Sequence, residues 1–293
     1  MRRSRIEAIG TSVNGRYLRK CGSVRRAVEA GRRCLARSHY HRADVRVLIN
    51  TGTYRDGHVC EPANACYIQH GLGINIEFQG RRTLAFDLLN GGCGMLNGVH
   101  VITTQMRAGE VQVGMVVSSE ANRDRRPDPA YTYPSSGAAV LLDVSPRRDV
   151  GFGAFAFQTN EEHAELFQSV VSLEEKRGRI VLTRASDLEH AYTAAVPGVL
   201  DEVLAAERLC RDEIDLVVPA QISPAFVGRL PRAMGIEAGR IVDYTASLPD
   251  THSTSLFLAL DRLLTEAPPK PGTKAVFLAF GSGITVGAAV YRF

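Results

Sequence analysis

Cys93 lies in the segment of the chain best suited to covalent chemistry. Gly91, Gly92 and Gly94 surround it, where a β-rich run ends and an apolar helical run begins. Glycine lets a ligand approach the backbone closely, and a helix start supplies free N–H groups and partial positive charge. Both effects favour the reactive thiolate. We therefore predict that Cys93 is a nucleophile; the alternative is a small buried cysteine that packs a tight turn.

The composition excludes several other classes of function. The chain has 293 residues, 45% hydrophobic and 23% charged, which is typical of a soluble globular protein. Its arginines are scattered, so nucleic-acid binding is not expected. No apolar run approaches the roughly 20 residues of a membrane span, and no signal peptide is evident, which predicts a cytoplasmic location. The six cysteines form no metal-binding spacing, and we expect most of them to be buried thiols.

Short β-rich runs alternate with helical runs, which predicts an α/β protein. Two similar halves are expected, 1–148 with the nucleophile and 149–293. The predicted strands are 5–13, 45–50, 83–88, 111–118, 138–143, 151–158, 215–219, 274–280 and 284–293. The predicted helices are 23–37, with Ser23 as its cap, 64–71, 93–108, 188–209, 224–234 and 253–265.

Three motifs in order resemble β-ketoacyl-ACP synthase III and its relatives in the thiolase superfamily. They are FDLLNGGCGMLNG (86–98), VVSSE (116–120) and AFGSGITVG (279–287), within a similarity from Gly22 to Phe293. The resemblance implies a thiolase-type five-layered αβαβα sandwich and a homodimer. It also implies that Cys93 is the nucleophile and that the backbone N–H groups of Cys93 and Ser282 form an oxyanion hole. The acyl donor would be an acyl-CoA or the phosphopantetheine of an acyl carrier protein, with no permanently bound cofactor and no metal.

Two positions depart from the family pattern. The family's V-P-H-Q reads Val218-Pro219-Ala220-Gln221 here, and its G-N-T-S reads Pro249-Asp250-Thr251-His252. Alanine cannot donate a hydrogen bond and an ionised aspartate would repel an enolate, so ordinary malonyl condensation is not expected. Aspartate at this position resembles acyltransferase-like relatives. His252, oriented by Asp250, would then be the general base; alternatively, His252 is an inert helix-terminal histidine and Asp250 a helix cap.

The segment 54–65 is most similar to the branch that condenses two long acyl chains head to head. By that resemblance, Glu61 would be a base that reaches across a dimer interface; alternatively, it is a surface glutamate before a proline at a helix start. The chain also passes quickly from Gly15 to Gly22, where relatives carry a longer region. A wider mouth to the active site is therefore expected.

These observations predict, as the leading hypothesis, an acyltransferase with a cysteine-bound acyl intermediate. It would transfer the acyl group to a small-molecule or carrier-bound acceptor and form an ester, an amide or a C–C bond, in specialised metabolism. The alternatives are a catalytically silent structural partner of an active ketosynthase, and a thioester hydrolase.

Overall fold

Two β-sheets form the framework of the computed structural model, which describes residues 2–13, 22–76, 80, 82–174 and 178–293. The first sheet lies in the N-terminal half. In spatial order, its strands are β1 (Ser4–Val13), β5 (Ser136–Val144), β4 (Val113–Glu120), β2 (Val47–Asn50) and β3 (Leu84–Asp87). The central strands β2 and β4 are parallel and fully buried. Their continuous apolar runs fit a sheet that is covered on both faces.

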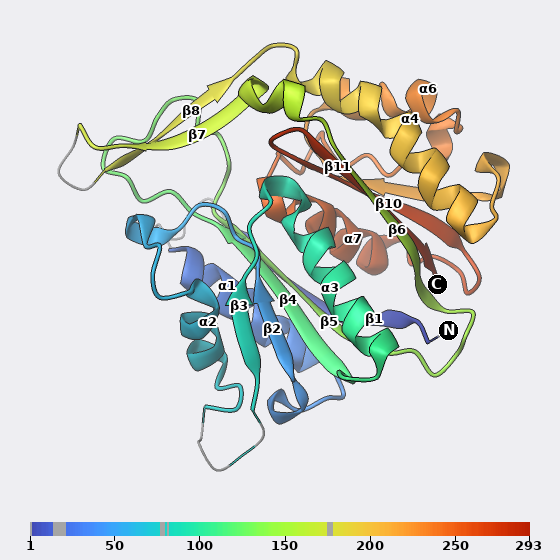
Figure 1. Cartoon of the computed structure of the whole chain (residues 1–293), viewed down its shortest axis with the longest axis horizontal. Coiled ribbons are helices and arrows are strands. Elements are labelled where there is room, and N and C mark those ends of the chain that lie inside the picture. Colours follow the sequence, from blue (N-terminus) through green and yellow to red (C-terminus); the bar gives the residue numbers. More distant parts are fainter. Residues whose placement is uncertain (1, 14–21, 77–79, 81, 175–177) are drawn as a thin grey trace.

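The second sheet lies in the C-terminal half. Its order is β6 (Gly151–Thr159), β11 (Thr285–Arg292), β10 (Lys274–Gly281) and β9 (Leu216–Pro219). A separate hairpin, β7 (Phe167–Ser172) and β8 (Arg179–Arg184), extends from one side of the molecule (Figure 1). The predicted boundary after residue 148 falls in the connection between β5 and β6, and the division into two half-domains stays a prediction.

The helices complete five layers. Helices α1 (Ser23–Arg37) and α2 (Asn64–Leu72) cover the outer face of the first sheet, and α3 (Gly94–Ala108) and α7 (Ser255–Glu266) lie between the sheets (Figure 1). The outer face of the second sheet carries α4 (Leu188–Glu207), with α5 (Pro224–Val227) and α6 (Leu230–Met234) beside it. The order helix, sheet, helix, sheet, helix is the predicted αβαβα sandwich.

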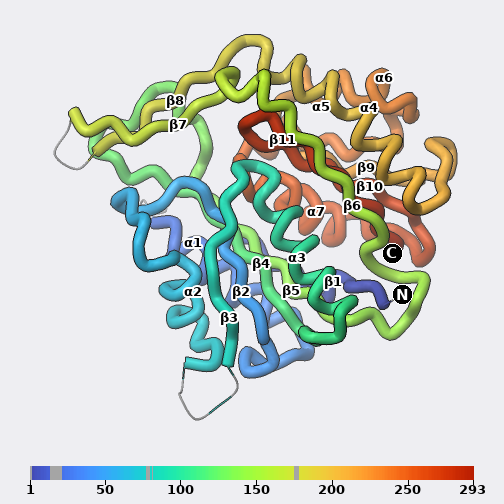
Figure 2. The backbone as a smooth tube through the Cα atoms, in the orientation of Figure 1, coloured from blue at the N-terminus to red at the C-terminus, as the bar shows by residue number. Residues whose placement is uncertain are grey.

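Short 3-10 turns connect these elements. They are η1 (Arg42–Asp44), η2 (Asp56–His58), η3 (Gly91–Cys93), η4 (Glu161–Leu166), η5 (Arg211–Glu213), η6 (Ala238–Arg240) and η7 (His252–Thr254). The first and last strands run close together, because the backbone N–H of Ile6 donates to the hydroxyl of Tyr291 at 3.2 Å. Figure 2 shows both chain ends on the same side of the molecule.

Most predicted elements are present within a few residues of their expected bounds, with three differences. The β7–β8 hairpin was not predicted. The predicted helix 224–234 is two short helices, because the first ends at Val227 and the second begins at Leu230, with Pro231 in its first turn. Ser23 is not the helix cap: Gly22 occupies that position, and the Ser23 hydroxyl accepts a hydrogen bond from the Asp56 N–H instead.

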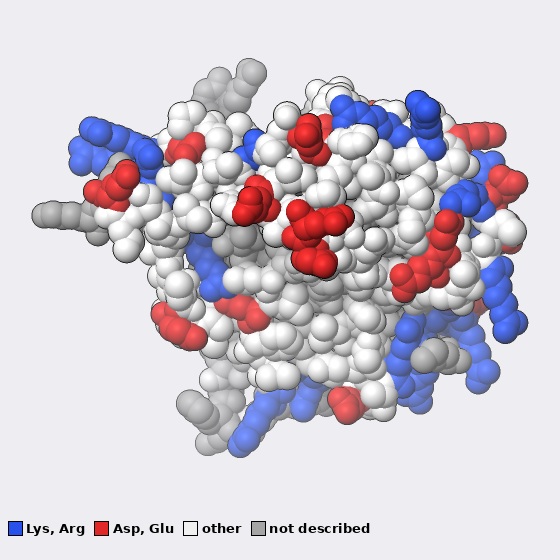
Figure 3. Space-filling model, turned by 45° about the horizontal axis from the view of Figure 1, so that its top comes forward, with Lys and Arg blue, Asp and Glu red and all other residues white. Residues whose placement is uncertain are grey.

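The surface carries both signs of charge. On the face shown in Figure 3, basic side chains gather near the edges of the view while acidic ones cross its upper half. Within the part of the chain that the structure describes, no helix has the length and apolar character needed to cross a bilayer.

Candidate active site

Cys93 lies at a sharp strand-to-helix turn. It ends η3 and directly precedes α3, as the sequence predicted. The turn is pressed against the end of β10, since a Cβ on Gly92 would lie 2.1 Å from the carbonyl oxygen of Phe280. On the facing strand, a Cβ on Gly281 would lie 3.4 Å from the Cys93 nitrogen and 2.8 Å from the Asn90 carbonyl oxygen. Glycine at 92 and 281 therefore lets the two backbones meet at the thiol.

The Cys93 thiol is fully buried, and burial raises its pKa. Its Sγ donates a hydrogen bond to the Thr285 carbonyl oxygen at 3.3 Å. The expectation that the helix start favours the thiolate is therefore wrong for this state of the site. Loss of solvent outweighs the partial positive charge at the start of α3, and the group is a neutral thiol.

The predicted oxyanion donors lie next to each other, but one is already engaged. The Cys93 N–H donates to the Asn90 carbonyl at 3.0 Å, which the sequence did not indicate. Ser282 follows Gly281 in the β10–β11 turn, and a Cβ on Gly91 would lie 3.3 Å from its nitrogen and 3.2 Å from its Oγ. A substrate oxygen at this place would have to share the Cys93 amide, as bifurcated bonds at helix ends do. The oxyanion role of both residues stays a prediction.

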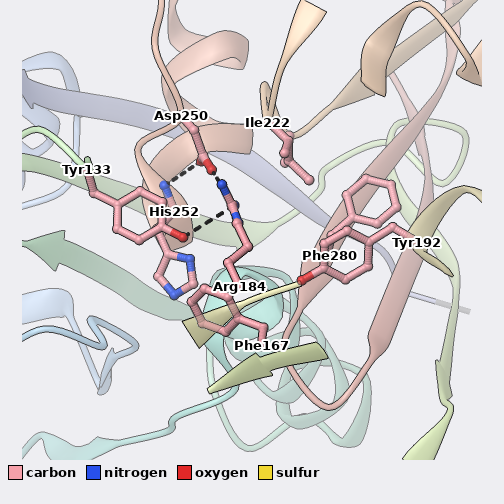
Figure 4. A pocket seen from close by; sticks show the side chains of 9 residues that line it. Tyr133, Phe167, Arg184, Tyr192, Ile222, Asp250, His252 and Phe280 are labelled. Carbon is pink, nitrogen blue, oxygen red and sulfur yellow. Dashed lines mark hydrogen bonds and ion pairs between the residues drawn. The ribbon is translucent and has the colours of Figure 1, made fainter. Parts of the chain in front are cut away.

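A small cavity lies beside this turn. Its volume is about 20 Å³, room for roughly one water molecule. Phe280, whose carbonyl faces Gly92, forms part of its wall, and η3 packs against η7 next to it. Figure 4 shows the lining side chains; together with Ala220 they are Tyr133, Phe167, Arg184, Tyr192, Ile222, Asp250, His252 and Phe280.

His252 and Asp250 both line this cavity, but not as a charge-coupled pair. Asp250 Oδ1 accepts a hydrogen bond from the backbone N–H of His252 at 2.8 Å, so it caps the turn rather than orienting the imidazole (Figure 4). The ring packs against Tyr54 and Tyr133, with centroids 5.4 and 4.9 Å away. Its Nε2 is buried and has no hydrogen-bond partner among the described residues. The capping role that the alternative explanation gave to Asp250 is therefore confirmed, while the choice between a catalytic and an inert His252 stays a prediction.

Burial sets the protonation of both groups. It lowers the pKa of His252 to about 3, with the positive charge of Arg184 acting in the same direction. It raises the pKa of Asp250 to about 6, against the opposing hydrogen bond from the His252 N–H. At neutral pH His252 is therefore a neutral base. His252 also has φ of 54°, unusual for a residue other than glycine.

Sequence reasoning missed Arg184, which enters the cavity from the end of β8. Its guanidinium lies 5.9 Å from the centroid of Phe167, which comes from β7. The missed signal was a pair of short runs with adjacent β-branched residues, QSVVS (168–172) and RIVLTR (179–184), on either side of a short polar segment ending in Gly178. That pattern is typical of a hairpin.

A larger groove opens on the other side of Tyr54. Its volume is about 620 Å³, and its walls include Val59, Phe86, Leu89 and Ile180. Tyr54 lines this groove, and its ring also packs at a tilt against His252, which lines the small cavity.

Glu61 is exposed and lines the groove, not the small cavity. Within one chain, the structure does not bring it together with His252 and Asp250. Its role across a dimer interface stays a prediction. The expected wider mouth depends on residues 14–21, which lie outside the described residues.

The remaining cysteines do not follow the expectation of mostly buried thiols. Cys34 is buried, whereas Cys60, Cys66 and Cys210 are exposed; Cys21 lies outside the described residues. Among the residues that the structure describes, no three His, Cys, Asp or Glu side chains gather in a way that could hold a metal ion.

Solved structures share this architecture over the whole chain. A variant of Xanthomonas campestris OleA with bound lauric acid and lauroyl-CoA superimposes with a TM-score of 0.85 at 16% identity, covering 99% of each chain. The 3-oxoacyl-(acyl carrier protein) synthase III FabH of Pseudomonas aeruginosa gives 0.84 at 19% identity, covering 100% of this chain and 98% of that one. These likenesses define the chain as a thiolase-fold protein.

Sequence comparisons narrow the class. The family described as 3-oxoacyl-(acyl-carrier-protein) synthase III C terminal matches residues 204–293. The β-ketoacyl-(acyl-carrier-protein) synthase III of Acidiphilium cryptum is 26% identical over 273 residues, covering 90% of this chain and 82% of that protein. That of Blochmanniella pennsylvanica is 27% identical over 271 residues with the same coverage. Together these findings support a β-ketoacyl-ACP synthase III-like protein of the thiolase superfamily. The similarities support a thiolase-type enzyme that condenses or transfers acyl groups.

Proposed function

We propose that the chain is an acyltransferase that carries its acyl group on Cys93. The donor is an acyl-CoA or an acyl carrier protein, and the acceptor a small molecule or a carrier-bound group of specialised metabolism. One observation carries the proposal: the Cys93 sulfur lies where the start of the central helix α3 meets the glycine turn at Gly281. Such a turn is built to hold one nucleophile against backbone donors.

The groove beside Tyr54 suits the acyl donor. Its 620 Å³ falls within the range of ligand sites, and its apolar walls match an alkyl chain. Tyr54 and the rings around the small cavity must move before a thioester reaches Cys93, because the thiol is sealed in this structure.

His252 is the base best suited to the transfer step. Its Nε2 is buried, neutral and without a partner in the described structure, so it can accept a hydrogen bond from the N–H or O–H of an entering acceptor. Because burial lowers the pKa of His252 to about 3, that pKa must rise when the acceptor binds before His252 can take the proton. Glu61 would be the base in the transfer step only if a second subunit placed its carboxylate over the active site. Ala220 offers no side-chain donor where the family's decarboxylating histidine stands, so the proposed reaction is transfer without loss of carbon dioxide.

The first test is loading of Cys93. Incubation with acetyl-CoA, octanoyl-CoA and lauroyl-CoA, followed by intact-mass spectrometry, should add one acyl group to the wild-type protein and none to Cys93→Ala. Cys66→Ala and Cys210→Ala are matched controls, because those thiols are exposed, lie outside the lining of the groove and should leave loading unchanged. Equal loading of Cys93→Ala, or no loading of the wild type by any donor, would contradict the proposal.

A second candidate function is a silent structural partner of an active ketosynthase. It is favoured by the sealed, neutral Cys93 thiol and by Ala220. The two candidates differ in whether the purified chain loads acyl groups by itself. A third, thioester hydrolysis, would release free acid at the same rate with and without an acceptor.

A further inference from the structure

A guanidinium occupies the cavity in which the family histidine is replaced by Ala220. Arg184 reaches in from β8 (Figure 4). Ala220 lies just after β9 in the wall of the same cavity. The cavity therefore contains a cation with several N–H donors. Arginine keeps its charge at every physiological pH, unlike the histidine that the family carries.

Arg184 is only loosely held by the protein. Its Nη2 lies 3.5 Å from Asp250 Oδ2 and 3.5 Å from the Tyr133 hydroxyl. For comparison, Arg5 forms a two-pronged pair with Asp143 at 2.8 and 2.9 Å. Among the residues that the structure describes, Nη1 and Nε of Arg184 have no hydrogen-bond partner. A guanidinium with unused donors beside a cavity is suited to a planar anion from outside the chain.

We propose that Arg184 binds the carboxylate of the acceptor, which is a small amino or hydroxy acid that keeps this carboxylate. The proposal rests on the proposed function, since it names the acceptor class for the same site. A carboxylate matches the two-pronged guanidinium geometry and is smaller than a phosphate, which suits a cavity of about 20 Å³ that must widen to admit any ligand.

The proposed ion pair between Arg184 and the acceptor carboxylate also explains why the acceptor keeps this carboxylate. Loss of carbon dioxide removes negative charge from the carboxylate, so a cation that binds this group stabilises the starting state more than the transition state. Asp250 already faces Arg184 and would compete with the acceptor. Because burial raises the pKa of Asp250 to about 6, it can take up a proton when a second carboxylate arrives.

The transfer step needs only the Cys93 thioester and the acceptor as reactants. The acceptor amine or hydroxyl attacks the acyl carbon of the Cys93 thioester, a C–N or C–O bond forms, and the C–S bond breaks. The sulfur leaves with the bonding electron pair, and the proton lost by the acceptor passes through His252 to this sulfur. The products are an N-acyl amino acid or O-acyl hydroxy acid and the free Cys93 thiol.

Binding of product analogues tests the proposal without any turnover. N-lauroylglycine and N-lauroylglycinamide have the same chain and differ at the carboxylate. Calorimetry should show that the wild type binds the acid at least about 10-fold more tightly than the amide, as expected for a charge-assisted hydrogen bond. Arg184→Met should lose this preference, Arg184→Lys should retain part of it, and Arg211→Met, in a surface ion pair with Asp201, should keep it.

Activity gives the second measurement. Acyl-loaded protein is mixed with the common amino acids, or with the matching amides, and the products are identified by mass spectrometry. The wild type should acylate acids over amides by about 10-fold to 100-fold, and Arg184→Met should lose this preference among the products it forms. Arg211→Met should load Cys93 and keep the preference.

Equal binding of acid and amide by the wild type, or a preference that survives in Arg184→Met, would overturn the assignment. So would release of carbon dioxide from malonyl-CoA by the loaded protein. Failure of Cys93 to load contradicts the proposed function instead, and the calorimetric comparison then still decides the role of Arg184.

Discussion

Glu120 is a fully buried acid that anchors the turn carrying His252. It ends β4 and accepts hydrogen bonds from the backbone N–H groups of Thr53 at 3.3 Å and Tyr54 at 2.8 Å. The hydroxyl of Ser253, the residue after His252, donates a further hydrogen bond to it. Burial nevertheless outweighs these donors and raises the pKa of Glu120 to about 7. One carboxyl group therefore links Tyr54, in the wall of the groove, to η7.

This shifted pKa predicts a pH-dependent stability. The folded protein holds the Glu120 proton more tightly than the unfolded chain, whose value is near 4.5. The stabilising contribution is therefore complete below about pH 4.5 and is lost as the pH rises towards 7, by roughly 3 kcal/mol in all. Urea unfolding of wild type and Glu120→Gln at several pH values measures it.

The difference in free energy of unfolding, wild type minus Glu120→Gln, should fall across that range. Contributions of Asp250 and His252 are present in both proteins and cancel in the difference. A difference that is constant with pH would show that Glu120 does not hold a proton in the fold.

At the scale of elements, the turn between β3 and α3 depends on the absence of side chains. A methyl group on Gly92 would lie 2.1 Å from the Phe280 carbonyl, which belongs to a strand that cannot move independently of its sheet. The nucleophile turn and the β10–β11 turn are thus fitted to each other through backbone contacts.

Gly92→Ala should therefore destabilise the protein by at least about 2 kcal/mol and abolish acyl loading of Cys93. Gly239→Ala is the matched control, because a Cβ there meets no atom within 4 Å. Thermal unfolding and intact-mass loading measure the two effects. Wild-type stability and loading in Gly92→Ala would mean that the turn is not as tightly packed as described.

The elements were more predictable than the site. Periodicity indicated the buried strands and α3, because each buries a continuous apolar face. The motif around Cys93 indicated that this residue lies at the strand-to-helix turn. The protonation of the Cys93 thiol, however, depends on how tightly Thr285 and the surrounding chain enclose the sulfur. The entry of Arg184 into the cavity depends on a hairpin that packs against a distant part of the chain, which local pattern does not encode.

At the scale of the whole molecule, the first sheet ends in an unpaired strand. Among the residues that the structure describes, β3 pairs with β2 on one side and with no strand on the other. Beside this edge, Leu84 is 57% exposed, Leu89 55% and Tyr67 47%. Open strand edges with exposed apolar side chains invite pairing with another chain. This arrangement supports the proposed homodimer.

Analytical ultracentrifugation should therefore give about twice the mass of one chain. Leu84→Lys should shift the protein towards monomer, because a charge on the edge opposes pairing. Ala246→Lys, in an exposed loop of the second half, is the control and should leave the mass unchanged. A wild-type protein that is monomeric at micromolar concentration contradicts the homodimer.

Cys93 belongs to the first half of the chain, whereas Arg184, Ala220, Asp250 and His252 belong to the second. The candidate active site thus lies at the interface between the N-terminal and C-terminal halves of the chain, and each half contributes residues to it. A small rotation of one half relative to the other would change the space around the Cys93 Sγ while leaving every strand intact. Substitutions in the middle of α3 or α7, which lie between the two sheets, can therefore alter how readily this interface opens at Cys93.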